Sequence, residues 1–289
     1  MSTTAKTAST GANEFRHLGR RRPGFLSEVL GTSGMQVSAG LAIVSLFSVL
    51  ALLAPWIAPH DPTQTGPFFL MPPDNTHWLG TDELGRDVFS RLLHGGRVSI
   101  SVGLGAALIA TCIGLPLGLV AGYNGGKYDL AIMQVANLFI ALPSLVLALM
   151  ITAMVGPTLI NIILVLGLVG WPRVARLVRG QVLALREMVY IEAARAAGGS
   201  DFYIMVHHLL PNTRRIVAAQ FSLTVAYAMV TSASLSFLGL GIPPPEPDWG
   251  GMVRAGVPYL AMSPLISLSG SATVSLTVLG FYLIGSGQK

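Results

Sequence analysis

The sequence predicts an all-α integral membrane protein with six transmembrane helices. Of its 289 residues, 52% are hydrophobic and only 11% are charged, and the mean hydropathy is +0.64. Soluble domains carry roughly a quarter charged residues, so this chain has too few polar side chains to cover a surface that faces water. Its apolar residues are also concentrated in long stretches without charge. These stretches are Leu41–Ala58, Val98–Asn124, Leu130–Gly170, Ile216–Pro245 and Ala255–Ser286.

Each of these stretches is long enough to cross a bilayer as a helix. A hydrocarbon core of about 30 Å takes about 20 apolar residues of helix, which satisfies its own backbone hydrogen bonds. Leu130–Gly170 is too long for one span, and Val155-Gly156-Pro157 predicts a turn that divides it in two. A soluble protein of this length could not bury so many uncharged segments. The predicted spans are 36–58, 98–121, 130–152, 158–178, 216–238 and 263–285.

The basic residues predict the orientation of the spans. Residues 1–35 are rich in Ser, Thr and Ala and are expected to form a disordered cytoplasmic tail. The polar leader and the long first apolar run favour a retained helix over a cleaved signal peptide. With the N-terminus inside, four of the 18 Lys and Arg residues lie outside, and fourteen, including Arg173 and Arg176, lie inside. Basic residues favour the cytoplasmic side, so both termini are predicted there. Positive loops beside anionic lipid are sufficient to explain the net charge of +5 without a nucleic-acid partner.

The outer loop 59–97 contains three acidic residues close together, Asp82, Glu83 and Asp87. They could suggest a metal site, but their spacing fits no calcium-binding loop. Arg86 and Arg91 are nearer partners for these carboxylates. We therefore predict a folded, ion-paired outer element and no metal site here. The adjacent pair His207-His208 does not have the spacing of ligands on one helix face and predicts no metal site either.

The inner loop 179–215 predicts two short helices. Residues 186–197 are rich in good helix formers, and Gly198-Gly199 interrupts them because glycine adopts the left-handed angles of a tight turn. Ser200 is expected to cap a second helix with Asp201 in its first turn. That helix is expected to end before Pro211. These features leave open whether the loop is an ordinary folded connection or a docking element for another protein.

Three motifs resemble the permease subunits of ATP-binding-cassette importers. The first is Glu192-Ala193-Ala194 with Gly198 and Leu210-Pro211, which is similar to the EAA loop of that family, although His208 replaces its usual apolar residue. The others resemble the C-type permeases of oligopeptide, dipeptide and nickel importers and run from residues 80 to 87 and from 235 to 250. The resemblance covers residues 35–260, whereas the C-terminus lacks the charged tail usual in the family.

The resemblance implies a type I importer permease that works with other subunits. The expected partners are a second homologous permease, two ATPase subunits and an external solute-binding protein. The family motif implies that the ATPases are contacted through Glu192, Ala193, Ala194, Gly198, Asp201, Leu210 and Pro211. It also implies di- or oligopeptide cargo, with nickel or glutathione as alternatives within the family.

The remaining predictions concern the path and the energy source. The polar groups in the spans are mostly neutral, and those chosen for a weakly selective translocation path are Asn137, Ser144, Asn161, Gln220 and Thr224. No phosphate-binding loop is present, because the look-alike around Lys127 lacks the leading glycine and the hydroxyl residue. ATP is therefore expected to bind to partner subunits, and this chain is expected to carry no cofactor.

The outer loop 239–260 is either a docking surface or a passive cap. An ion-coupled transporter is the main rival, but such proteins carry ionisable residues within their spans. A structural membrane protein would not need the inner-loop motif.

Overall fold

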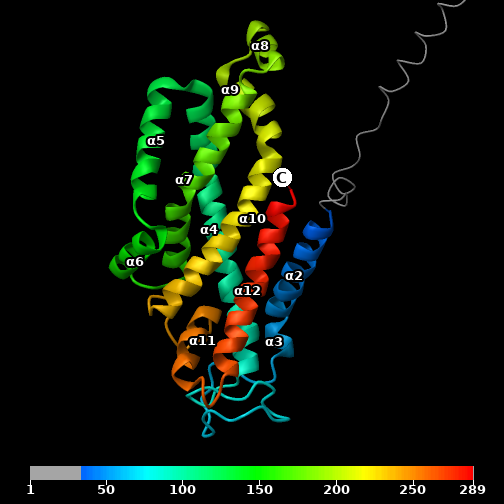
Figure 1. Cartoon of the computed structure of the whole chain (residues 1–289), viewed down its shortest axis with the longest axis vertical. Helices are drawn as coiled ribbons and strands as arrows, with labels where there is room; N and C mark the ends of the chain where they lie inside the picture. Colours follow the sequence, from blue (N-terminus) through cyan, green and yellow to red (C-terminus); the bar gives the residue numbers. More distant parts are fainter. Residues whose placement is uncertain (1–33, 289) are drawn as a thin grey trace, which may run out of the picture.

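A computed structural model describes residues 34–288. Residues 1–33 of the predicted N-terminal tail therefore lie outside the described residues. The described chain is an elongated helical bundle (Figure 1). In this part of the chain the one β-type pairing is an isolated bridge between Thr81 and Asp87, which confirms the all-α fold class. Five long helices run along the bundle: α2 (Gly34–Leu52), α4 (Val88–Asn124), α7 (Leu159–Leu185), α10 (Leu210–Phe237) and α12 (Leu265–Ser286).

Helix α4 packs closely against α7 through glycines spaced four residues apart, which lie on one helix face. These glycines are Gly114, Gly118 and Gly122. A Cβ atom placed on Gly118 would lie 2.6 Å from the carbonyl oxygen of Ala175 and 2.7 Å from Cβ of Val178. Small residues allow membrane helices to approach backbone to backbone. The α4–α7 pair is therefore a close backbone-to-backbone seam, and it holds α7, which lines the site described below.

The predicted third span is not one straight helix. Within residues 34–288, five helices are long and apolar enough to cross a membrane, and a sixth crossing exists if α5 (Gly126–Ala141) and α6 (Ser144–Val155) are one broken span, bent by 87°. The break falls at Leu142-Pro143, where Leu142 is extended at φ −95° and ψ 141°. Proline disfavours the α conformation in the residue before it, which explains the break. The predicted turn at 155–157 is confirmed, since α6 ends at Val155.

The inner loop forms the short helix α8 (Val189–Ala196), followed by α9 (Asp201–Ile204), the π-helical turn η2 (Met205–Leu209) and α10. The first predicted helix is confirmed, but the second does not end before Pro211. It continues through η2 into α10 without a break. A proline is tolerated in the first turn of a helix, and the wider π turn that precedes it accommodates the missing N–H of Pro211, the second residue of α10.

The opposite end of the bundle holds α3 (Ala54–Ile57), the loop 58–87, α11 (Trp249–Gly256) and the 3-10 turn η3 (Val257–Tyr259). Figure 1 shows these elements at the far end from α8, whereas α2 begins and α12 ends toward the α8 side. Helix α10 ends at Phe237, before the prolines, as expected. Trp249 is 2% exposed and its indole N–H donates to the carbonyl of Leu92 at 2.8 Å. This contact fixes α11 on the N-terminal end of α4.

Candidate functional site

A cavity of about 410 Å³ lies between α6, α7 and α10. Apolar residues form most of its wall, and a small group of polar side chains from the three helices projects among them. This polar group is Ser144, Arg173, Gln220, Thr224, Tyr227 and Thr231. An apolar wall with a few convergent polar groups is typical of a binding site for a small molecule.

Arg173 is the charged group of this cavity, and its neighbours hold it in place. Its Nη2 donates to Oγ of Ser144 at 3.2 Å. Its guanidinium carbon lies 3.8 Å from the centre of the Tyr227 ring, a cation–π contact. The hydroxyls of Tyr227 and Ser144 also share a hydrogen bond. The guanidinium carries five N–H donors, so one bond to Ser144 leaves capacity to bind an anionic group.

The structure brings together three of the five predicted path residues. Ser144, Gln220 and Thr224 line the cavity, and Nε2 of Gln220 donates to Oγ1 of Thr224 at 3.3 Å. Asn161 does not line it. Its amide donates to the carbonyls of Val155 and Gly156, at 3.0 Å each, and so fixes the turn between α6 and α7.

Asn137 belongs to a second cavity, of about 490 Å³, between α5 and α7. There it accepts a hydrogen bond from Nη2 of Arg176, and Asp129 forms two bonds of 2.5 Å with Arg179. Charged side chains therefore line both cavities beside the mostly neutral polar groups that were expected. The missed signal was present in the sequence, because Arg173, Arg176 and Arg179 are spaced three apart and residues at that spacing share one helix face.

The glycine turn and the serine cap of the inner loop form as the sequence predicted. Gly198 adopts φ +86°, and the N–H of Gly199 returns to the carbonyl of Ala194 at 3.0 Å. Oγ of Ser200 then accepts from the N–H of Tyr203 at 3.3 Å, which caps α9. Glu192 and Ala193 lie exposed on α8, and Leu210 and Pro211 lie in the first turn of α10.

The loop is attached to the bundle as well as folded on itself. Oδ1 of Asp201 accepts from the hydroxyl of Tyr123, at the end of α4, at 2.9 Å. Three fully buried apolar side chains form the base of the loop: Ile191, Ile204 and Leu209. A displacement of the loop would therefore displace the helices beneath it.

The tip of the loop exposes a patch of large apolar side chains. Val189 is 78% exposed and Phe202 is 72% exposed, and Met188, Tyr190 and Tyr203 are exposed beside them. An exposed apolar patch rimmed by polar residues marks an interaction site. The position of this patch at one end of the bundle indicates a partner outside the membrane-spanning region.

The outer element is ion-paired as predicted, with one correction. Asp82 binds Arg86 at 2.7 Å and Arg91 at 3.4 Å, and Glu83 binds Arg86 at 3.0 Å. Asp87 is not part of this network. It accepts from the N–H of Ser90 and so caps α4, and histidine side chains contact its carboxylate.

These features define a multi-pass membrane protein of the transport class, with a polar-centred cavity inside the helices and an apolar docking patch at one end. Residues 114–286 match the family described as binding-protein-dependent transport system inner membrane component. Residues 38–73 match the N-terminal transmembrane domain of oligopeptide transport permease C. The chain belongs to the first of these families, and is a transmembrane permease subunit.

Three characterised proteins illustrate the similarity. The chain is 38% identical over 255 residues to the glutathione transport system permease protein of Pectobacterium atrosepticum, which covers 88% of this chain and 84% of that protein. It is 40% identical over 253 residues to the dipeptide transport system permease protein of Bacillus subtilis, covering 87% and 79%. The inward-facing MetNI methionine ABC transporter shares the fold, with a TM-score of 0.57 and 20% identity over 68% of this chain and 93% of that one.

Proposed function

We propose that this chain forms half of an import path for short peptides and that separate ATPase subunits, docked on α8 and α9, drive it. The observation that supports this proposal most directly is that α9, η2 and α10 form one continuous helical segment. This continuous segment joins the exposed apolar patch of the inner loop to the side chains that line the cavity. Closure of the ATPases would move α8 and α9, and α10 would carry that motion to Gln220, Thr224 and Tyr227.

The chemistry of the cavity supports peptide cargo. A di- or tripeptide ends in a carboxylate, and a guanidinium forms charge-assisted, bidentate hydrogen bonds with that group. Arg173 supplies the guanidinium, while Ser144, Gln220 and Thr224 offer neutral partners for amide groups. A nickel ion would instead meet the positive charge of Arg173. The names of the dipeptide and glutathione permeases similar to this chain agree with a short peptide.

The remaining partners follow from the family and from the two ends of the bundle. A second, homologous permease would supply the other half of the path, and an external solute-binding protein would dock near α11 and the loop 58–87. The inner loop would then face the cytoplasm together with both termini. The ATPase subunits would bind ATP, since this chain has no phosphate-binding loop.

An ion-coupled mechanism has less support. Within the helices α2, α4 to α7, α10 and α12, the one acidic residue is Asp129. Its carboxylate is bound on both oxygens by Arg179. A proton- or sodium-coupled carrier needs an ionisable group that can exchange its ion, and this ion pair holds the carboxylate in place.

Reconstitution in liposomes with the co-purified subunits tests the proposal. We expect dipeptide uptake to require ATP on the side of the membrane that the inner loop faces. We also expect uptake to be lost in Phe202→Glu, because a charge in the apolar patch prevents the ATPases from docking. The matched control is Arg214→Glu, an exposed change of charge on the same side of the bundle. Uptake that needs a proton or sodium gradient instead of ATP, or ATPases that co-purify fully with Phe202→Glu, would contradict the proposal.

A further inference from the structure

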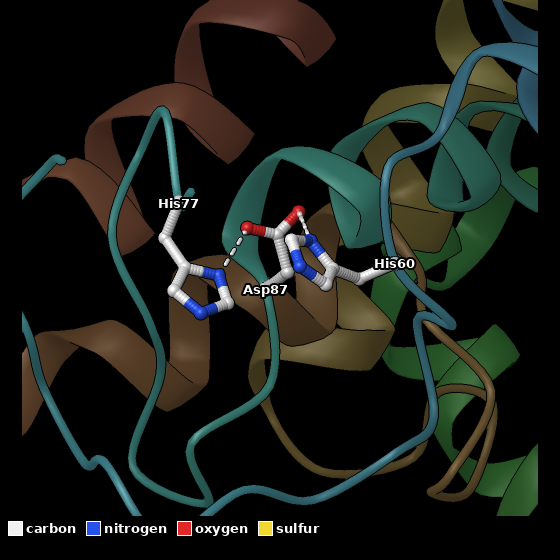
Figure 2. Close-up of side chains that lie close together, drawn as sticks. All are labelled: His60, His77 and Asp87. Carbon is white, nitrogen blue, oxygen red and sulfur yellow. Dashed lines mark hydrogen bonds and ion pairs between the residues drawn. The ribbon is translucent and has the colours of Figure 1, made fainter. Parts of the chain in front are cut away.

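Three residues that are far apart in the sequence meet at the outer end of α4, and we propose that they bind one zinc ion. His60 follows α3, His77 lies in the loop before α4, and Asp87 is the residue that caps α4. Figure 2 shows both imidazole rings beside the carboxylate. One ligand atom from each of the three residues lies within 4.8 Å of the others, the one such group found in residues 34–288.

The distances suit a zinc ion. Zinc bonds of about 2.1 Å in a tetrahedral arrangement place neighbouring ligand atoms about 3.4 Å apart. Nδ1 of His77 lies 2.9 Å from Oδ1 of Asp87, and Nδ1 of His60 lies 3.8 Å from Oδ2 of the same carboxylate. These two separations, each to a different oxygen of Asp87, lie on either side of that value, and the two imidazole rings stack with their centres 4.6 Å apart. Two imidazoles and a carboxylate form a three-ligand set of the kind zinc accepts, with water in the fourth position.

The charges around the carboxylate favour a cation. Asp87 is 2% exposed, and a buried carboxylate needs a compensating positive charge. The nearby guanidiniums do not supply it, because Arg86 and Arg91 are both directed to Asp82. The imidazoles carry a positive charge only when they are protonated. A divalent ion would neutralise the carboxylate with both rings neutral, and it would displace the proton that His77 shares with Asp87.

The backbone of each histidine and the carboxylate of Asp87 are held by contacts outside the group. The N–H of His60 donates to Oγ of Ser90 at 3.1 Å, and the N–H of His77 donates to Oδ1 of Asp74 at 2.5 Å. The N–H of Ser90 in turn donates to Oδ2 of Asp87 at 2.8 Å. Such supporting bonds orient metal ligands and are part of a built site.

The site is accessible from outside the protein and joins separate segments. The His60 side chain is 39% exposed and that of His77 is 20% exposed, so an ion can reach both rings. A bound zinc would connect the chain after α3, the loop before α4 and the N-terminus of α4. We expect it to stabilise this outer element without contacting the cavity between α6, α7 and α10.

The test is zinc binding by the full-length chain, purified with the subunits that stay bound to it and through a tag other than polyhistidine. After removal of metal with a chelator, the protein is titrated with Zn²⁺ alone, and the bound metal is counted by mass spectrometry. We expect one zinc per chain in the wild type. We expect at least tenfold weaker binding in His60→Gln and in His77→Gln. His207→Gln, a histidine of the inner loop outside the group, is the control and should bind as the wild type does.

A second measurement uses only the wild type, so it stands even if a variant fails to fold. One equivalent of Co²⁺ should give the intense visible absorption of a four-coordinate site, and Zn²⁺ should abolish that absorption and raise the thermal unfolding temperature. The proposal is overturned if the wild type binds no more zinc than the His60→Gln, His77→Gln double variant. Equal loss in His207→Gln, or a Co²⁺ spectrum of six-coordinate ions only, would overturn it too.

Discussion

At the scale of single residues, the position of Arg173 has the most direct functional consequence. Its guanidinium is held between Ser144 and Tyr227 at the wall of the cavity. A hydrogen bond to a charged group contributes about 1.5–3 kcal/mol, which corresponds to a factor of roughly ten to a hundred in affinity. An arginine at this place would therefore select for cargo with a negative group.

The first prediction is that Arg173→Gln raises the KM for a dipeptide about tenfold or more, because the variant loses the charge-assisted bond to the carboxylate. Uptake of the radiolabelled peptide into proteoliposomes measures this change. Arg176→Gln, one helix turn away and outside this cavity, is the control. A C-terminally amidated dipeptide should lose far less affinity in Arg173→Gln. An equal loss for the two peptides would show that Arg173 does not read the carboxylate.

The second prediction concerns Gly198, whose φ of +86° is strained for a side chain with a Cβ although no atom lies near enough to clash. We expect Gly198→Val to strain the turn by about 1–3 kcal/mol and to reduce ATP-driven transport strongly. Gly198→Asn is the control, because asparagine tolerates the left-handed region, and it should keep most activity. Wild-type transport in the valine variant would show that the turn does not couple the subunits.

Sequence reasoning at this scale succeeded where partners are close along the chain. Asp82 and Arg86 are four residues apart, and Ser200 caps a helix that begins at the next residue. The pairing of Arg173 with Tyr227, 54 positions later, depends on how α7 and α10 pack. No local pattern predicts that packing, so this part of the site could only be found in the folded structure.

At the scale of the helices, the α4–α7 seam holds α7, one of the three helices that line the cavity, against α4. The third prediction is that Gly118→Leu prevents this contact, because even a Cβ atom would lie 2.6 Å from the carbonyl oxygen of Ala175. We expect the variant to be poorly expressed or to unfold at a clearly lower temperature in detergent. Gly180→Leu is the matched control, since nothing lies within 4 Å of its added Cβ. Similar stability of the two variants would contradict the importance of the seam.

The broken pair α5–α6 and the continuous α9–η2–α10 segment show why helix boundaries were harder to predict than helix positions. Apolar composition predicted one span over 130–152, yet Pro143 fixes the residue before it in an extended conformation. The opposite error occurred at Pro211, which was expected to end a helix and instead lies in the first turn of α10. The effects differ because Leu142 before Pro143 is extended, whereas the π turn before Pro211 accommodates its missing N–H and the helix continues.

At the scale of the whole molecule, the fourth prediction is the topology. Single cysteines at Ser200 and Glu246, introduced into a Cys112→Ser background, should react with a membrane-impermeant reagent from opposite sides of the membrane. Both positions are exposed, whereas Asp248 nearby is buried and caps α11. Labelling in intact cells and in inverted vesicles distinguishes the sides. Reaction of both cysteines in intact cells would contradict the proposed orientation.

The continuous helical segment can tilt as one rigid body. Asp201–Phe237 spans 37 residues, and at 1.5 Å per residue it is about 55 Å long. A tilt of about 10° around its centre would move each end by about 5 Å in opposite directions. Its midpoint is Ala219, and its cavity-lining residues begin next to it at Gln220 and continue to Thr231. The docking patch and the contact with α11 would travel furthest, while Gln220 and Thr224 near the midpoint would move least, so access could alternate while this part of the cavity stays nearly in place.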